Sequence, residues 1–443
     1  MSEGNLAEEI LNKILKIAES GAVAVYRKVS RQVRFSVNKI DIAKEWDETT
    51  ISLLIEKEKK MFVLELSYRA RDRVDDIIKK VEEALKVMPP KPYYAPLPEP
   101  EKYSPIPNAF DKVTIEHPEK MIDIAKISID SALKEGAKKV AGAIYTNAFW
   151  ASVVTSAGFK GEAKFTNTYL DVRAFCNGLE TGHASIASRS IKNIRAEEIG
   201  RIAAKYAKLS REPKKLKAGK YDAIFTPDAV ASLLNFVGMM SSGFAVIAGY
   251  SAFTQKIDTK VASKKVTIAD NPRYEDSYYP APFDEEGVAT KENILIENGI
   301  LKTYLHNRIT AKLLNAKHTG NAGWLFPHPW NLIVKPGDAT EEEMISDISE
   351  GLLIGNVTYI RFQDYLRGDF SGIIRDGVIY IKNGEIQHAV KGLRLSDNII
   401  NWLQNIDVIG KEPRQIYHWW LEMNTPVVSV PVLVRKANFT EAW

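Results

Sequence analysis

A proline-rich segment constrains the fold of this chain more than any other feature. Eight of the nineteen residues from Pro89 to Pro107 are proline. Each proline fixes φ at about −65° and removes a backbone N–H donor, so neither a helix nor an inner strand can run through the segment. The segment predicts an extended, Pro-rich linker over 89–110 that follows an N-terminal α+β domain at 1–88.

Composition and pattern divide the rest of the chain. The sequence predicts a central α+β domain over 111–209, a second linker in the polar, basic stretch 210–220, and a large β-rich C-terminal domain over 221–443. A chain of 443 residues is too long for one compact core, and two or three domains are expected. We therefore predict a multi-domain α+β protein, with two small N-terminal α/β units and a β-rich C-terminal domain.

Apolar periodicity places the elements within these domains. Apolar side chains at helical spacing predict helices over 6–20, 71–88, 118–135 and 191–209. Alternating or continuous apolar runs predict short strands over 22–27, 33–37, 50–55, 61–66, 140–145, 150–155 and 164–176. A helix over 229–240, with Asp228 as its N-cap, is predicted near the start of the C-terminal domain.

Two Asn-Gly pairs predict β-hairpins in the C-terminal domain. Asn298-Gly299 and Asn383-Gly384 each lie between two short apolar runs. Asn-Gly is the preferred pair for a type I′ turn, in which both residues need a positive φ. Close to the first hairpin, Asp284–Gly287 predicts a turn in which Asp284 bonds its own backbone, and 309–314 predicts a short helix.

Composition and charge exclude several classes of function. The net charge is +4, and its 60 basic and 56 acidic residues are spread along the chain, which gives no basic face for nucleic acid. Cys176 is the single cysteine, so a Cys-rich zinc site and an intramolecular disulfide are excluded. The lack of a disulfide is what we expect of a protein in a reducing cytoplasm. The N-terminus is unlike a signal peptide, and no window approaches ~18 uninterrupted apolar residues. We expect a cytoplasmic protein without membrane or nucleic-acid contacts.

Several motifs in the second half of the chain resemble those of the TldD/PmbA family, whose members were once called modulators of DNA gyrase. They are the stretch Phe283–Trp324, which holds Asp-Glu-Glu-Gly and the first Asn-Gly hairpin, then Asn331-Leu-Ile-Val-Lys-Pro-Gly, Gly368-Asp-Phe-Ser and Ile381-Lys-Asn-Gly-Glu-Ile. The resemblance covers nearly the whole chain and is densest from Tyr221 to Glu412.

The resemblance implies a metal-binding motif on the helix predicted at 229–240. In the catalytic TldD branch this helix carries His-Glu-x-x-x-His, in which two histidines bind zinc and the glutamate is the general base. Counted back from Ser251-Ala-Phe-Thr, the motif falls on 234–239, where Leu234 and Met239 replace the histidines and Asn235 replaces the glutamate. Leucine has no donor atom, asparagine takes up no proton at neutral pH, and a thioether is a poor zinc ligand.

A different register does not restore the motif. Residues 210–286 contain no histidine. In the catalytic branch a cysteine nearer the C-terminus resembles a third zinc ligand, but in this chain no cysteine follows Cys176. The sequence is therefore similar to the PmbA/TldE branch, which keeps the fold and lacks the metal. This chain is expected to have no catalytic residues, and to bind no metal or other cofactor of its own.

The resemblance implies a non-catalytic subunit of a cytoplasmic zinc metallopeptidase complex that acts on unfolded proteins or peptides. Its partner is a TldD-like chain that carries the His-Glu-x-x-x-His motif and the zinc. This chain is expected to be inactive alone, to complete the chamber of the heterodimer, and to help hold the substrate as an added β-strand. A homodimer remains possible for the chain alone.

Two alternatives stay open at the level of the sequence. One is a self-associated peptide-binding or scaffold protein without a protease partner, and the other is an autonomous metallopeptidase with relocated ligands such as His318 and His328. Polar turns and glycines concentrate in Phe283–Trp324, which we predict to line the substrate cavity. The candidate cavity residues there are Asp284, Gly287, Asn298, Gly299, His318, Gly320 and Asn321.

Three further expectations concern single residue types. Asp284, Glu285 and Glu286 are interpreted as a turn rather than as a functional carboxylate cluster. Cys176, in an apolar strand row, is expected to be an inert core residue. Trp419, Trp420 and Trp443 are interpreted either as interface anchors or as core residues.

Overall fold

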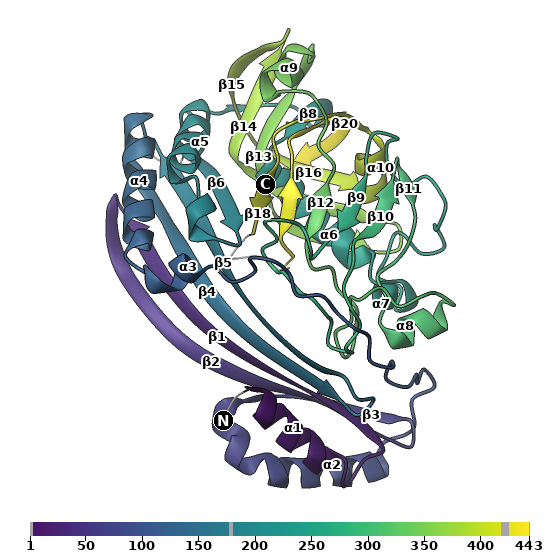
Figure 1. Ribbon diagram of the computed structural model, residues 1–443. Helices are drawn as coiled ribbons and strands as arrows, with labels where there is room; N and C mark the ends of the chain where they lie inside the picture. The colour runs from purple at the N-terminus through teal and green to yellow at the C-terminus, as the bar shows by residue number, and fades with distance from the viewer. Residues whose placement is uncertain (1–2, 177–179, 418–424, 443) are drawn as a thin grey trace.

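The computed structural model of this protein describes residues 3–176, 180–417 and 425–442, so Trp419, Trp420 and Trp443 lie outside the described residues (Figure 1). An N-terminal sheet with its helices packs against a C-terminal body that contains two further sheets. The protein is thus a mixed α+β protein, and this fold class was predicted correctly. Among the described residues, no helix is both long and apolar enough to cross a bilayer.

One six-stranded antiparallel sheet contains strands from both N-terminal units. Its order is β3-β2-β1-β4-β5-β6. The strands are β1 (Ser20–Ser36), β2 (Lys39–Lys57), β3 (Lys60–Ser67), β4 (Lys139–Thr155), β5 (Lys160–Phe175) and β6 (Thr181–Ser188). The register of β1 on β4 runs from Ala22↔Thr155 to Phe35↔Gly142. The regions 1–88 and 111–209, predicted as separate units, therefore share one continuous sheet in space.

The strands of this sheet are longer than the sequence pattern predicted. The ranges 22–27 and 33–37 belong to one strand, β1, and 140–145 and 150–155 belong to one strand, β4. Polar residues interrupt the apolar pattern at mid-strand, but the sheet satisfies them. Ser30 Oγ donates to Asn147 Oδ1 at 2.7 Å, and Asn147 Nδ2 donates to Asn167 Oδ1 at 2.7 Å.

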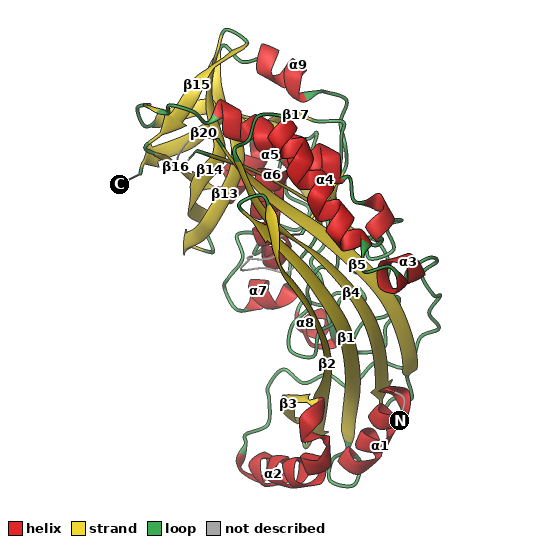
Figure 2. Cartoon of the chain, turned by 90° about the vertical axis from the view of Figure 1, so that its left-hand side faces the viewer, coloured by secondary structure: helices red, strands yellow, loops and turns green. Residues whose placement is uncertain are grey.

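Four long helices cover one face of the sheet (Figure 2). Two of them, α1 (Glu3–Ile14) and α2 (Val74–Val87), lie at one end, and α4 (Lys120–Lys134) and α5 (Ala196–Leu209) lie near the other. The predicted helix 6–20 ends early, at Ile14, because β1 begins at Ser20. Short helical segments complete this half: η1 (Tyr68–Arg73), α3 (Lys112–Glu116) and η2 (Ile191–Asn193).

The alternation of side chains along β1 separates the two faces of the sheet. Val23, Val25, Val33 and Phe35 pack under the helices. The intervening residues point to the C-terminal body, where Ala22 and Ala24 pack with Phe159, Phe283 and Trp324. The proline-rich segment contains no helix or strand and runs between these layers, with Tyr103 4.7 Å from Phe283 between ring centroids.

The C-terminal body holds an eight-stranded and a six-stranded sheet. The eight-stranded sheet consists of β7 (Lys214–Lys215), β8 (Gly219–Phe225), β13 (Glu350–Asp364), β14 (Asp369–Lys382), β15 (Glu385–Lys391), β16 (Leu393–Asn398), β17 (Ile406–Ile409) and β20 (Val432–Glu441). The six-stranded sheet consists of β9 (Ile268–Asp270), β10 (Asn293–Glu297), β11 (Ile300–Leu301), β12 (Leu332–Val334), β18 (Arg414–Ile416) and β19 (Val427–Ser429).

Both predicted Asn-Gly hairpins are confirmed. In the turn between β10 and β11, Asn298 has a φ of 48° and Gly299 a φ of 82°. In the turn between β14 and β15, Asn383 has a φ of 50° and Gly384 a φ of 76°. Local turn chemistry was thus sufficient to place these two connections.

Helix α6 (Pro227–Met240) is the central helix of the body, and its N-cap differs from the prediction. Thr226 is the cap, and its side chain accepts the N–H of Ala229. Asp228 instead points into the interior, where it accepts hydrogen bonds from Ser185 and pairs with Arg414. The described residues of the body also form four shorter helices: α7 (Gly243–Ile247), α8 (Arg308–Leu313), α9 (Glu341–Ser346) and α10 (Ile399–Gln404).

Candidate functional site

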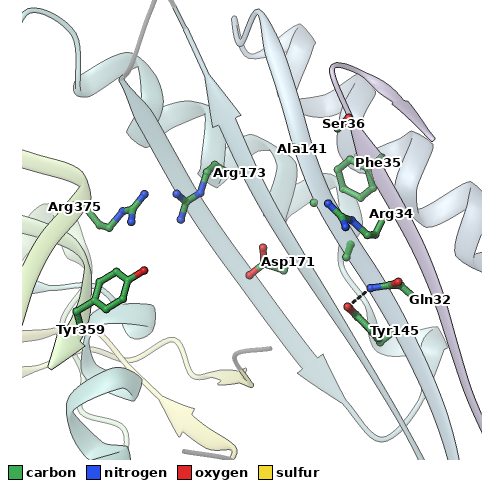
Figure 3. Close-up of a pocket in the computed structure, with 12 residues that line it drawn as sticks. Gln32, Arg34, Phe35, Ser36, Ala141, Tyr145, Asp171, Arg173, Tyr359 and Arg375 are labelled. Atoms are coloured by element: carbon green, nitrogen blue, oxygen red, sulfur yellow. Dashed lines mark hydrogen bonds between the residues drawn. The ribbon is translucent and has the colours of Figure 1, made fainter. Parts of the chain in front are cut away.

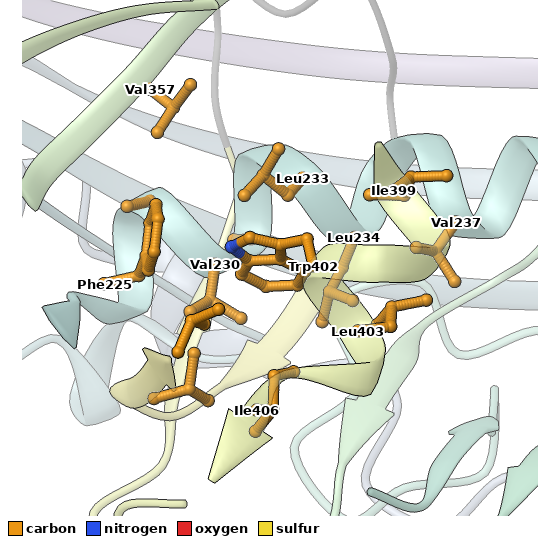
Figure 4. Close-up of a cluster of buried hydrophobic side chains, with 14 of the residues drawn as sticks. Phe225, Val230, Leu233, Leu234, Val237, Val357, Ile399, Trp402, Leu403 and Ile406 are labelled. Carbon is orange, nitrogen blue, oxygen red and sulfur yellow. The ribbon is translucent and has the colours of Figure 1, made fainter. Parts of the chain in front are cut away.

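The helix face on which the resemblance places a metal motif is part of the hydrophobic core. Leu234 is 1% exposed and belongs to the cluster around Trp402, which is fully buried (Figure 4). Met239 is half-buried and packs against the same cluster. Strand β12 lies so close to the helix that a Cβ on Gly238 would come within 2.8 Å of Leu332 Cδ1.

Asn235 is buried on this face with its amide fully bonded. Its Nδ2 donates to the carbonyl of Ala231 at 2.9 Å, and its Oδ1 accepts the N–H of Thr425 at 3.3 Å. Both bonds are to the backbone, so the amide contributes to the packing of the helix and leaves no group directed at a ligand. A carboxylate general base would need to reach a water molecule from this position.

The residues of this face do not fit a zinc ion. Zinc takes imidazole, thiolate or carboxylate donors, and the face offers an aliphatic chain, an amide and a thioether. Across the described ranges, no group of three or more His, Cys, Asp or Glu side chains is placed to hold a metal. No step of a metal-assisted reaction is therefore derived for this chain.

The two histidines proposed as relocated ligands are engaged elsewhere. His318 Nε2 bonds Glu286 Oε2 at 2.9 Å, and His318 Nδ1 accepts the N–H of Gly320 at 3.0 Å. Both ring nitrogens of His318 therefore have protein partners. His328 is half-buried, and its ring packs against Trp330 with 4.8 Å between the ring centroids. Burial lowers the pKa of His328 to about 4.

A compact polar region is built around the turn at Asp284–Gly287. Asp284 Oδ1 accepts the N–H groups of Glu286 and Val288, each at 3.0 Å, and Oδ2 accepts the N–H of Ala322 at 2.8 Å. Gly287 adopts a φ of 82°. The predicted turn is thus confirmed, and it also holds three buried or nearly buried carboxylates that the turn interpretation alone did not suggest.

Arg308, at the start of α8, joins this turn to the N-terminal sheet. Its Nη1 lies 3.1 Å from Glu286 Oε1, and its Nη2 bonds Glu56 Oε1 on β2. The three side chains are only 2–3% exposed. Arg308 Nε also donates to the carbonyl of Ala95, in the proline-rich segment, at 2.8 Å. One guanidinium therefore links three distant parts of the chain.

Glu285 makes a second connection to the sheet, as a neutral acid. Its Oε1 accepts the hydroxyl proton of Tyr26 on β1 at 3.0 Å, and its Oε2 accepts the N–H of Trp324 at 3.0 Å. Burial raises the pKa of Glu285 to about 8. Burial also raises the pKa of Asp284 to about 7, although His318 opposes the shift. The group holds protons near neutral pH and connects two layers of the molecule.

The predicted cavity residues separate into two sets. Asp284, Gly287, His318, Gly320 and Asn321 lie in this polar region, where Asn321 Nδ2 donates to Asp270 Oδ2 at 2.6 Å and His318 Nε2 lies 3.7 Å from Asp284 Oδ2. The hairpin residues lie apart, since Asn298 and Gly299 bond to the backbone and side chains of 261–267. A role in substrate binding stays a prediction for both sets.

An open cavity that no sequence pattern predicted lies between the sheet and the body (Figure 3). Its volume is about 440 Å³. It is lined by Gln32, Arg34, Phe35, Ser36, Ala141, Gly142, Ala143, Tyr145, Asp171, Arg173, Tyr359 and Arg375. These residues come from β1, β4 and β5 of the N-terminal sheet and from β13 and β14 of the eight-stranded sheet, so the cavity depends on two separate sheets lying side by side.

Comparison with known proteins adds to this geometry. Residues 218–441 match the family model described as the PmbA/TldA metallopeptidase C-terminal domain. A protein of Methanocaldococcus jannaschii named as a metalloprotease is 32% identical over 210 residues, which cover 44% of this chain and 44% of that protein. The chain spans about half the length of the curated relatives it matches.

Two solved structures share the fold over nearly the whole chain. TldE from Thermococcus kodakarensis superposes with a TM-score of 0.86 at 20% identity, covering 98% of this chain and 100% of that one. A protein of Thermotoga maritima, described as a putative modulator of a DNA gyrase, superposes with a TM-score of 0.84 at 22% identity and with the same coverage. At these identities the likeness establishes the fold alone.

Proposed function

Because this chain belongs to the PmbA/TldD metallopeptidase family, we propose that it is a non-catalytic subunit of a zinc metallopeptidase complex acting on unfolded proteins or peptides. One observation carries the proposal. At the positions of the catalytic motif, α6 presents Leu234, Asn235 and Met239 to a packed core, and none of them supplies a zinc ligand or a general base.

The partner is a TldD-like chain that carries the His-Glu-x-x-x-His motif. Peptide hydrolysis by zinc needs a metal with an open coordination position and a carboxylate beside the bound water. In the complex these groups belong to the partner. This chain contributes walls of the chamber and contacts that hold the substrate, which require a stable scaffold rather than reactive side chains.

A free sheet edge supports the role in holding substrate. Strand β3 pairs with β2 only over Thr50–Lys57, so along Lys39–Thr49 the outer edge of β2 has no strand partner among the described residues. An extended peptide binds to such an edge through main-chain hydrogen bonds that do not depend on its sequence. The charged side chains along this edge oppose non-specific pairing with another copy of the sheet.

Mixing this chain with the TldD-like chain of the same genome tests the proposal. We expect an equimolar complex by size-exclusion chromatography with light scattering, and hydrolysis of an unfolded fluorescent substrate by the complex. A Glu→Gln change in the partner's motif should abolish hydrolysis, while Met239→Leu, a swap of similar volume at a half-buried position of this chain, should leave it unchanged. If no complex forms, the chain is instead a self-associated peptide-binding or scaffold protein.

A further inference from the structure

The cavity between the sheet and the body has the chemistry of a carboxylate site. We propose that it binds a carboxylate group of the peptide substrate, either the C-terminal carboxylate or an acidic side chain. This inference rests on the proposed function, because it takes the ligand to be a peptide. It assigns to this subunit the recognition of one charged end or side chain of the substrate.

Three guanidinium groups line the cavity from separate strands. Arg34 extends from β1, Arg173 from β5 and Arg375 from β14, and Figure 3 shows Arg375 facing the sheet across the cavity. Asp171 is the one carboxylate that lines it with them. A guanidinium presents a planar fork of N–H donors that matches the two oxygens of a carboxylate, so this composition favours a carboxylate ligand.

Asp376 holds two of these guanidinium groups without neutralising both. Its buried Oδ2 lies 3.0 Å from Arg173 Nη2 and 3.3 Å from Arg375 Nε. Its Oδ1 accepts the hydroxyl proton of Thr181 at 2.6 Å. Two positive charges thus share one negative charge, and their positions are fixed before a ligand arrives. Such pre-organisation reduces the entropy that binding costs.

Arg34 is the guanidinium that remains available to a ligand. Its side chain is exposed and makes no hydrogen bond or ion pair with any other residue that the structure describes. The negative charge of Asp171 opposes it only weakly, because Asp171 Oδ2 bonds His183 Nε2 at 2.7 Å. Burial lowers the pKa of His183, but the negative charges of Asp171 and Asp228 more than offset this and keep the pKa above its ordinary value.

Two β-bulges shape the wall on the side of the body. The pairing of β13 with β14 shifts in register between Ile354 and Asn356 and again between Thr358 and Arg361. At these shifts Tyr359 has a φ of 49° and Asp376 a φ of 60°. Non-glycine residues with positive φ are uncommon, and bulges redirect side chains next to functional sites. Here they direct Tyr359 to the cavity and place Arg375 beside it.

Size and wall chemistry favour a peptide group over a phosphate. The volume of about 440 Å³ lies within the roughly 300–1,000 Å³ of small-ligand pockets. Ala141 and Ala143 add apolar wall for a side chain next to the carboxylate. All lining residues lie on strands, whereas phosphate sites commonly use the N–H groups of a helix N-terminus.

The test measures peptide binding by the isolated full-length chain. Three fluorescent hexapeptides are compared by anisotropy: one with a free C-terminal carboxylate and no acidic side chain, its C-terminal amide, and the amide with a single glutamate. We expect the neutral amide to bind about tenfold or more weakly than a carboxylate-bearing peptide. Tight binding of the free acid identifies the C-terminus as the ligand, and tight binding of the glutamate peptide identifies an acidic side chain.

Arg34→Gln supplies the matched variant, because Arg34 makes no contact that the fold needs. We expect it to weaken the carboxylate-bearing peptides about tenfold and to leave the neutral amide unchanged. Arg27→Gln, on the same strand but outside the cavity, is the control and should bind all three peptides as the unmodified chain does. Unchanged thermal unfolding of both variants shows that the fold is intact.

Several outcomes overturn the inference. They are equal binding of the free acid, the amide and the glutamate peptide, no binding of any of them, no effect of Arg34→Gln, or displacement by inorganic phosphate at concentrations at which acetate has no effect. The result is independent of the partner chain and of zinc. Binding without complex formation would reject the proposed subunit role, whereas complex formation without carboxylate-dependent binding would reject only this inference.

Discussion

Two buried regions of the molecule have opposite chemistry. The face of α6 that carries Leu234 is apolar and closely packed, although the family resemblance makes it the place for a metal. The junction of the sheet with the body buries Arg308 between two carboxylates, and Glu285 lies nearby. In a metallopeptidase the charged groups are expected on the helix.

The difference indicates what each region does. The polar groups of the junction bond to other segments: Arg308 bonds Glu56 on β2 and the carbonyl of Ala95 in the proline-rich segment, and Glu285 bonds Tyr26 on β1. Buried charge therefore joins the layers, and it does not by itself mark a catalytic centre. Helix α6, on which the family resemblance predicts a catalytic motif, packs as part of the core.

Replacing Arg308 with methionine should have the largest effect on stability. Arg308→Met leaves Glu56 and Glu286 buried without a cation, and breaking a buried pair in this way costs about 3–5 kcal/mol. Urea unfolding followed by circular dichroism measures the change. Arg27→Ala removes an exposed pair with Asp47 and should cost about 1 kcal/mol or less. Equal effects of the two changes would remove the distinction between the junction and the surface.

Truncation on α6 should show that its motif face is structural. Leu234→Ala removes a fully packed side chain and should lower the free energy of unfolding by about 2–4 kcal/mol. Met239→Ala, at a half-buried position on the same helix, should cost less. A stable Leu234→Ala variant that lost only the activity of the complex would instead assign Leu234 to the chamber.

The pKa of Glu285 predicts a dependence of stability on pH. Its carboxyl has an ordinary pKa of 4.5 when unfolded and a pKa of about 8 in the folded protein. Between these values the folded state binds the extra proton, so the free energy of unfolding falls as pH rises through this window. Above the folded pKa the full penalty is present.

Glu285→Gln tests this dependence. The glutamine of the variant cannot ionise. Between about pH 6 and about pH 9 we therefore expect the free energy of unfolding to fall by roughly 1–3 kcal/mol less in the variant than in the unmodified chain. Thermal unfolding over this range is the measurement, with Glu412→Gln on an exposed loop as the control. An unchanged fall in the variant would show that Glu285 is already ionised at neutral pH, and a steeper fall would also contradict the raised pKa.

The smallest effect is expected at the first Asn-Gly hairpin. Asn298→Ala places alanine at a φ of 48° and should cost roughly 0.5–1.5 kcal/mol. Asn383→Ala makes the equivalent change in the other hairpin and should have a similar cost. Weaker peptide binding by Asn298→Ala, without loss of stability and without a parallel in Asn383→Ala, would place this hairpin in the substrate site.

Local sequence signals predicted local structure. The Asn-Gly hairpins, the turn at Asp284 and the short helix before Leu314 follow from two to six neighbouring residues, and all three are present. The residue types alone show that the side chains of Leu234 and Met239 are not suitable zinc ligands. These features were accessible because no distant contact decides them.

The remaining features depend on pairing between distant segments. Nothing near Ser30 indicates that Asn147 will satisfy it in mid-sheet, so one long strand appeared as two short ones. Asp228 seemed a helix cap because the pattern did not show Arg414 opposite it. The cavity is likewise formed by segments of the chain that are more than a hundred residues apart, such as β1 and β13. The alternation of side chains along one strand shows which residues share a face of the sheet, but it does not show which segment packs on that face.

The most direct test of the central claim is the zinc content of the isolated chain, measured by inductively coupled plasma mass spectrometry together with hydrolysis of an unfolded substrate. Because α6 offers no ligand, we expect zinc far below one equivalent per chain and no hydrolysis above background. One tightly held zinc per chain, with hydrolysis that a chelator abolishes and zinc restores, would contradict it.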